Sequence, residues 1–152
     1  INTSDYTVHQ LKSLIFDIAQ EYITRRQMRL RILSFGFKYG TPPGADLIMD
    51  VRFLANPYFV PELNPLDGNT QAVQDYVLKD ARTNQFLKKY LDLLDYLIPL
   101  YEKEGKAYLT IAVGCTGGRH RSIVIAGVVF EHISHPQRDV TLTHRDIDQE
   151  KT

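Results

Sequence analysis

Apolar positions along the chain recur with two different periods, and the changes of period divide it into successive elements. Spacing of three and four residues predicts amphipathic helices in three segments, 6–22, 69–80 and 81–105. The first has Ser4 or Asp5 as its predicted N-cap. Short alternating or β-branched runs predict four strands, at 28–36, 47–54, 107–114 and 138–146.

The apolar segment 122–133 fits a buried strand as well as a buried helix. It follows a glycine-rich turn and is long enough for about three helical turns, the mean for globular helices, so we predict a helix. Strands separated by helices are typical of α/β folds. We therefore expect a three-layer domain whose mostly parallel sheet, of about four strands, has helices on both faces.

Composition excludes several classes of function. The chain has 152 residues, 43% hydrophobic and 24% charged, which suits one globular domain. Its 18 basic and 18 acidic side chains cancel, so any polyanion binding would depend on local clusters. A single cysteine excludes an internal disulfide, and the apolar runs are too short to span a bilayer. No secretory signal is recognisable, so we expect a cytoplasmic protein that does not bind membranes.

The stretch GCTGGRHRS, Gly114–Ser122, joins a predicted strand to a predicted helix. Glycines let the backbone curl closely around a ligand. Unpaired N–H groups of the loop and the first helical turn, the helix dipole and the Arg121 guanidinium would all favour an anion in one place. This pattern predicts a phosphate-binding loop, although its spacing differs from that of the Walker A motif.

Cys115 and Arg121 also stand in the Cys-x5-Arg spacing of tyrosine phosphatases, which leaves a catalytic alternative with Cys115 as nucleophile. That signature usually has histidine before the cysteine, where this chain has Gly114. A phosphatase of this class also needs an aspartate as general acid. Three aspartates can be nominated, but their contexts select none of them: Asp46, Asp67 and Asp146.

Polar residues that follow the first predicted strand, lie on the second or end the last are candidate contacts for a ligand or partner, because parallel strands bring their carboxyl ends to one edge of the sheet. The candidates are Lys38, Tyr39, Asp50, Arg52, His144, Arg145 and Asp146. For Asp50 and Arg52, a structural ion pair is an equally good interpretation. No set of His, Cys or carboxylate residues has the spacing of a zinc site, and we predict neither a metal nor a cofactor.

Three segments resemble the C-terminal domain of the RapZ/YvcJ family, and the likeness extends from about Arg31 to Asp148. They are LTIAVGCTGGRHRSIVIA, SFGFKYGTPPGADLIMDVRFLANPY and HRDID. The opening NTSDYTVHQLK resembles the seam after that family's N-terminal P-loop NTPase domain. We therefore expect residues 1–152 to form one such C-terminal domain, with residues 1–12 as the seam.

The resemblance implies a cytoplasmic bacterial nucleotide-binding protein with a regulatory function. In enterobacterial members this domain senses glucosamine-6-phosphate, and the protein presents a small regulatory RNA to an endoribonuclease as an RNase adapter. Gram-positive members are linked to UDP-sugars and nucleotides instead. The expected function is therefore a non-catalytic sensor of a phosphorylated aminosugar or UDP-sugar, and self-association is expected of an adapter.

The family's loop pattern carries over to this chain at every position, and it implies that the cysteine is a loop residue. The matching residues are Cys115, Thr116, Gly117, Gly118, Arg119, His120, Arg121 and Ser122. Two departures matter. Asn56-Pro57-Tyr58-Phe59 stands where some members have Asn-Pro-His-Trp, which leaves the ligand open but makes Asn56 and Tyr58 candidate contacts. The basic tail of enterobacterial members is replaced by residues 148–152, DQEKT, which weakens the expectation of RNA binding.

Overall fold

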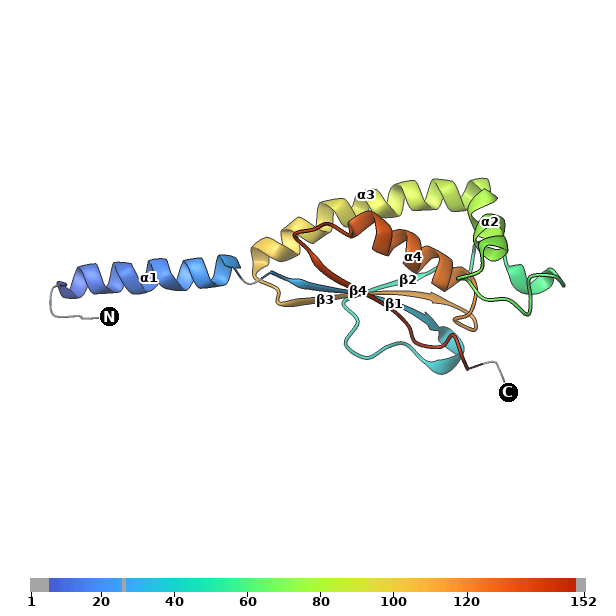
Figure 1. The fold of residues 1–152 in the computed structure, drawn as a ribbon, viewed down its shortest axis with the longest axis horizontal. Helices are drawn as coiled ribbons and strands as arrows, with labels where there is room; N and C mark the ends of the chain where they lie inside the picture. Colours follow the sequence, from blue (N-terminus) through green and yellow to red (C-terminus); the bar gives the residue numbers. More distant parts are fainter. Residues whose placement is uncertain (1–5, 26, 150–152) are drawn as a thin grey trace.

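The computed structural model describes residues 6–25 and 27–149, and every predicted helix and strand is present in it. The elements are α1 (Val8–Arg25), β1 (Arg29–Gly36), β2 (Leu47–Asp50), α2 (Gln71–Lys79), α3 (Ala81–Glu104), β3 (Tyr108–Cys115), α4 (Arg121–Ile133) and β4 (Asp139–His144). Two 3-10 helices, η1 (Phe37–Tyr39) and η2 (Pro57–Phe59), lie in the connections after β1 and β2. The ambiguous segment 122–133 is a helix, as predicted (Figure 1).

Local sequence explains where the helices begin and end. The Thr7 hydroxyl accepts a hydrogen bond of 3.3 Å from the first turn of α1, whereas the predicted caps Ser4 and Asp5 lie outside the described residues. Asp80 caps α3 with its carboxylate at 2.7 Å, and Gly105 ends α3 in the left-handed region with φ of 85°. Among the described helices, none is both long and apolar enough to cross a membrane.

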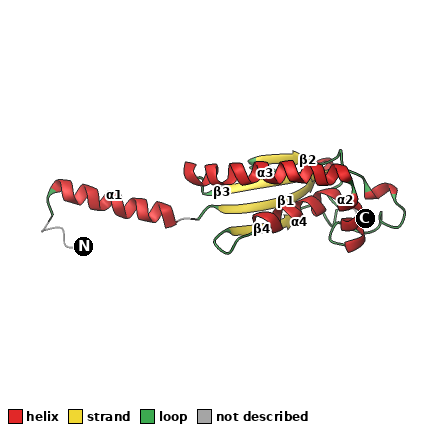
Figure 2. Ribbon diagram, turned by 90° about the horizontal axis from the view of Figure 1, so that it is seen from above, coloured by secondary structure: helices red, strands yellow, loops and turns green. Residues whose placement is uncertain are grey.

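The four strands are all parallel and lie in the order β2-β3-β1-β4. Right-handed crossovers are the rule between parallel strands, so connections that step in opposite directions along a sheet pass over opposite faces. The step from β1 to β2 runs against the other two steps. Accordingly, α2, α3 and α4 cover one face, and η1 with the loop after it covers the other (Figures 1 and 2). The expected three-layer α/β fold with a parallel sheet is confirmed.

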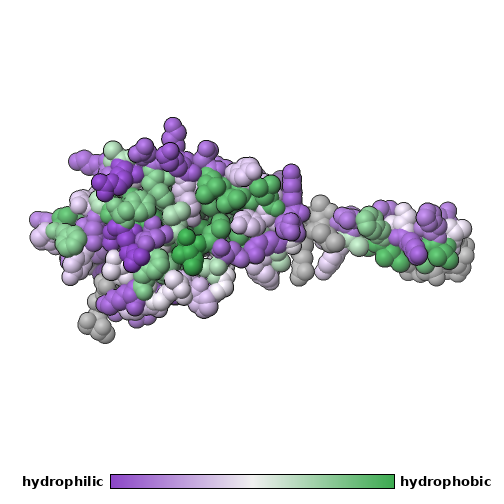
Figure 3. Space-filling view, turned by 180° about the vertical axis from the view of Figure 1, so that it is seen from behind, coloured by the Kyte–Doolittle hydropathy of each residue, from purple (hydrophilic) through white to green (hydrophobic). Residues whose placement is uncertain are grey.

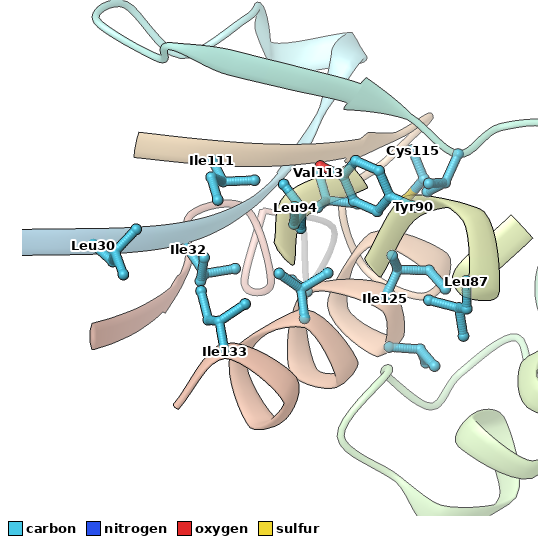
Figure 4. Packing of buried hydrophobic residues seen from close by; sticks show 14 of the residues in the cluster. Leu30, Ile32, Leu87, Tyr90, Leu94, Ile111, Val113, Cys115, Ile125 and Ile133 are labelled. Atoms are coloured by element: carbon cyan, nitrogen blue, oxygen red, sulfur yellow. The ribbon is translucent and has the colours of Figure 1, made fainter. Parts of the chain in front are cut away.

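The main core lies between the sheet and the helices, where alternate residues of β1 and β3 meet α3 and α4 (Figure 4). The buried side chains there include Leu30, Ile32, Ile111, Val113, Leu94, Ile98, Ile125 and Val129. A smaller core on the opposite face joins Leu33, Phe35 and Ala112 to Phe37 and Ala45. Both strands alternate between buried and more exposed residues where they begin, and their last five residues are buried on both faces, so only these C-terminal parts are mostly apolar.

This topology also fixes where a ligand would bind. The neighbours β1 and β3 send their following connections to opposite faces of the sheet, which opens a crevice beyond their carboxyl ends. Ligands of open parallel sheets bind at such switch points. The loop between β3 and α4 lies there.

Candidate functional site: the loop between β3 and α4

Two loops touch backbone to backbone at the switch point. Gly118 has φ of 76°, and a Cβ on it would lie only 2.5 Å from the backbone nitrogen of Gly36. A Cβ on Gly36 would in turn lie 2.5 Å from the carbonyl carbon of Gly117. Glycine is therefore required on both sides of this contact, since any side chain would push the loop after β3 away from the loop after β1.

The loop presents backbone N–H groups that the described part of the chain leaves unused. Within residues 6–25 and 27–149, no acceptor is bound by the N–H groups of Gly117, Gly118 or Arg119. The first turn of α4 adds further N–H groups, because a helix leaves its first donors without intrahelical partners. These donors and the positive end of the α4 dipole meet in one place, which suits an anion.

Arg119 and His120 hold the irregular segment 56–70 against the loop. The Arg119 guanidinium donates to the carbonyl oxygens of Pro65 at 2.8 Å and Leu66 at 3.2 Å. The His120 Nε2 atom lies 3.2 Å from the carbonyl oxygen of Asn64, which can only accept. These side chains, which were predicted to bind ligand, thus have structural partners in the protein.

Arg121 is 4% exposed and joins the loop to the segment after β2. Its Nη1 donates to the carbonyl oxygens of Arg52 at 2.6 Å and Leu54 at 3.2 Å, and its Nη2 lies 3.4 Å from the Thr116 hydroxyl. Its buried Nε has no partner among the described residues. Burial lowers the pKa of Arg121, and the Asp50 carboxylate is one of the groups that oppose this. The guanidinium remains charged at neutral pH and places a cation beneath the loop.

Cys115 points into the core instead of the mouth of the loop. Its side chain lies on the helix-covered face of β3, and the residue is 3% exposed (Figure 4). Its Sγ lies 3.1 Å from the Ser122 Oγ. A Cβ at position 114 would lie 2.5 Å from ring atoms of both Phe35 and Phe37. The histidine that precedes the cysteine in phosphatase signatures therefore has no room here.

The nominated general acids already have other partners. Asp46 accepts from the Thr110 N–H at 2.9 Å and pairs with Lys106 at 2.9 Å; burial alone would raise its pKa, but these partners hold it below its usual value. Asp146 is 2% exposed and accepts from the Gly36 N–H at 2.8 Å. Asp67 caps a turn by accepting from the Asn69 N–H at 2.9 Å. The geometry gives the phosphatase alternative no support.

Asp50 and Arg52 form the structural ion pair that was one of their two interpretations. The Arg52 guanidinium donates twice to the carboxylate of Asp50, with Nη2 at 2.7 Å and Nε at 3.0 Å. These hydrogen bonds are the main reason that the pKa of Asp50 is lowered. The same guanidinium stacks over the Phe37 ring, 4.1 Å from its centroid. The pair therefore fastens the end of β2 to η1.

The structure brings Lys38 to the loop and leaves Tyr58 in solvent. The backbone N–H of Lys38 donates to the carbonyl oxygen of Thr116 at 3.1 Å, and both side chains are exposed. The Lys38 ammonium also lies over the ring of Tyr39, 5.4 Å from its centroid. Asn56 caps η2 by accepting from the N–H of Tyr58, whose side chain is 55% exposed. Lys38 and Thr116 are thus exposed residues whose backbones are bonded to each other at the loop.

The residues at the end of β4 brace the loop after β1. The Nδ1 atom of His144 lies 2.7 Å from the Ser34 hydroxyl. Burial lowers the pKa of His144, an effect that Asp67 partly opposes. The Arg145 guanidinium donates to the carbonyl oxygen of Gly40 at 2.6 Å. His144 is half-buried beside the site, whereas Arg145 has a structural partner.

Other residues help to build the site. Asp146, which was nominated as a general acid and as a candidate contact at the end of the last strand, anchors Gly36. Gly68 lies against the loop so closely that a Cβ on it would be 2.5 Å from the His120 carbonyl oxygen. The length of the irregular segment 56–68 suggests a functional loop, but Gly68 itself was not among the predicted contacts. Ser34 was not predicted either, because nothing in the sequence distinguishes it from an ordinary strand residue. In the described part of the chain, no three His, Cys, Asp or Glu residues are grouped to hold a metal ion.

Comparison with known proteins identifies the family of this chain. The sequence profile of the RapZ C-terminal domain matches residues 28–148. The chain belongs to the RapZ C-terminal domain family. Its relatives include a "Nucleotide-binding protein" of Desulforapulum autotrophicum, 58% identical over 151 residues, which are 99% of this chain and 52% of that protein. Proteins with the same name occur in Geotalea daltonii, 46% identical over 149 residues (98% of this chain, 52% of the relative), and Heliobacterium modesticaldum, 46% identical over 151 residues (99% and 50%).

This RapZ-type chain spans about half the length of the curated relatives that it matches. The matched part includes the phosphate-loop candidate and the whole sheet, because the family profile extends from Met28 to Asp148. The names of the relatives describe nucleotide binding and no catalytic activity.

Proposed function

We propose that the loop between β3 and α4 binds the phosphate group of a phosphorylated aminosugar or a UDP-sugar, and that this domain is a non-catalytic sensor. The observation that carries the proposal is the set of unused N–H groups at Gly117, Gly118 and Arg119, next to the start of α4. An anion there would accept several hydrogen bonds from donors that are already held in place.

The side chains around the loop support a division between phosphate and sugar contacts. The exposed Thr116 hydroxyl and Lys38 ammonium can reach an anion at the loop, while buried Arg121 contributes its charge from below. We expect Tyr58 and His144 to contact the sugar or base from the rim. Cys115 supports the loop through Ser122 and has no chemical step to perform.

Sensing requires that the bound state differ from the free state at the surface. The loop is bonded to the segment 56–70 through Arg119 and His120, and to η1 through Lys38. A ligand that draws the loop inward would therefore move two exposed segments. The family suggests three partners that could recognise this change: a regulatory RNA, an endoribonuclease, or a nucleotide-binding domain of the same longer protein. We expect the protein to be cytoplasmic and to self-associate.

Calorimetry with glucosamine-6-phosphate, UDP-N-acetylglucosamine and inorganic phosphate tests the proposal. We expect one of the sugar ligands to bind more tightly than phosphate alone. Cys115→Ser should leave the affinity within about threefold, because the hydroxyl can keep the contact with Ser122 and no thiolate is needed. Absence of binding by all three, with an intact fold, would contradict the proposal.

A generic aryl phosphate separates the sensor from the phosphatase alternative. The sensor is expected to show no turnover. Hydrolysis that disappears in Cys115→Ser would establish the enzyme and overturn the non-catalytic assignment. An RNA gel-shift series in rising salt, with and without the sugar ligand, tests whether ligand binding changes the affinity of the protein for RNA.

A further inference from the structure

Helix α1 (Val8–Arg25) carries an apolar face that no other described element covers. It projects from the sheet and takes no part in the extensive contacts between elements (Figure 1). Hydrophobic side chains run along it in the space-filling view (Figure 3). The exposed fractions are 75% for Val8, 59% for Ile15, 64% for Phe16, 46% for Ile18 and 69% for Tyr22.

An uncovered helix of this kind is unstable on its own. Isolated helices of about 15 residues are marginal in water, and most helices in proteins depend on a packed apolar face. Large exposed apolar patches mark interaction surfaces. The 18 residues of α1 therefore need a partner that covers them.

The width of the apolar face indicates what kind of partner this is. At 100° per residue, Leu14 and Phe16 extend the apolar arc to about 200°, and the polar positions inside it are Lys12 and the last residue of the helix, Arg25. Val8 and Ile15 lie seven positions apart, on the stripe that a two-helix coiled coil would use. The contact surface of such a coiled coil is much narrower than the apolar arc of α1. A second copy of α1 would leave Leu14 or Phe16 in water, whereas the core of a folded domain would cover the whole arc.

The family comparison separates α1 from the body of the domain. The C-terminal domain profile begins at residue 28, just after α1 ends, whereas the relatives match 98–99% of this chain and continue for about the same length again. A cleft of about 930 Å³ lies between the end of α1 and the ends of α3 and α4. Tyr22 lines it from one side, and Glu102 and Lys103 line it from the other. The helix is thus attached to the sheet domain without being packed against it.

We propose that α1 belongs to the fold of the other half of a longer protein and packs its apolar face into the core of that half. The boundary between the two domains then lies at residues 26–28, instead of at the expected seam of residues 1–12. The inference is independent of the loop's ligand, because it rests on residues at the opposite end of the sheet.

Hydrogen–deuterium exchange on the full-length protein and on the 152-residue chain tests this assignment. We expect the amides of α1 to exchange at least about tenfold more slowly in the full-length protein, while those of β1 and β3 exchange alike in both. Equal exchange of α1 in the two proteins would overturn the proposal.

Substitutions in the full-length protein identify the partner. Ile18→Asp should lower the melting transition of the other half and leave the transition of the sheet domain unchanged, because a charge would enter that core. Ser13→Asp, on the polar side of the same helix, is the matched control and should change neither. If Ile18→Asp prevents folding, Ile18→Ala should give a smaller loss in the same transition.

Analytical ultracentrifugation tests the alternative that a second copy of α1 covers the apolar face. If the full-length protein is a dimer that Ile18→Asp converts to monomers, with both melting transitions unchanged, the partner is a second copy of α1 and the proposal is wrong. A lowered transition of the other half without a change in mass supports it.

Discussion

Gly118 combines two separate requirements for glycine. Its φ of 76° lies in the left-handed region, and a Cβ there would meet the backbone nitrogen of Gly36 at 2.5 Å. Gly44 has nearly the same φ, 78°, but open space around it. The two glycines therefore allow backbone strain to be separated from steric clash.

We predict that Gly44→Ala lowers the free energy of unfolding by about 1 kcal/mol, the usual cost of a left-handed alanine. Gly118→Ala should cost about 3 kcal/mol or more, because the loops after β1 and β3 must also separate. Gly118→Ala should in addition abolish ligand binding at the loop. Urea unfolding measures both losses. Equal losses would show that the close contact between Gly118 and Gly36 adds nothing to the cost of the substitution.

The pH dependence of stability should report on His144. Burial holds its pKa below the ordinary 6.5, so the unfolded chain takes up a proton at a higher pH than the folded protein does. The unfolding free energy should therefore be highest above pH 6.5 and fall as the pH drops from there to the folded pKa. Asp46 and Asp50, whose pKa values are lowered from 3.8, lose their contributions only in more acid solution.

His144→Gln should flatten the pH dependence just below pH 6.5, since it removes the buried imidazole but keeps a polar partner for Ser34. The measurement is urea unfolding at closely spaced pH values. An unchanged slope in this variant would assign the effect to another group.

Among elements, the irregular segment 56–70 depends on the loop for its position. It has only the short η2 as regular structure, and its carbonyl groups at Asn64, Pro65 and Leu66 are bound by His120 and Arg119 of the loop. The loop is therefore both the candidate anion site and the anchor for its neighbour. Mutations in the loop will act on both.

We predict that Arg119→Ala lowers the free energy of unfolding by about 1 kcal/mol, because a partly buried hydrogen bond to the Leu66 carbonyl and an exposed one to the Pro65 carbonyl are lost. Hydrogen exchange in the segment 56–70 should accelerate, while the sheet is unaffected. Arg29→Ala is the control: its ion pair with Asp139 is 3.4 Å long and mostly exposed, so its loss should change neither. Equal effects of the two substitutions would contradict the anchoring role.

For the molecule as a whole, the parallel sheet determines which residues can act together. Residues from the ends of β1, β3 and β4 meet around Gly36 although more than 100 positions separate Gly36 from Asp146. The helix α1 lies outside this arrangement, at the opposite end of the sheet (Figure 1). The two regions can therefore be altered independently, which is the basis of the controls above.

The pattern of the chain was enough to predict the elements, their order, the parallel sheet and the glycine-rich loop, because period and turn residues are local properties. The family followed from the loop and the strand ends. The pattern could not distinguish a cation that faces a ligand from one that binds a carbonyl. Arg119 and Arg121 share a loop, yet their carbonyl partners are 53 to 69 positions away in the sequence.

Burial was equally beyond the local pattern. Cys115 lies inward because alternate residues of β3 face the helices, and α1 is uncovered because no other described element packs extensively against it. Tertiary packing decides such questions, since the free energy of a side chain depends on the neighbours that the fold brings to it. Local spacing determines secondary structure and the candidate loop; contacts between distant segments decide which side chains remain available to a ligand.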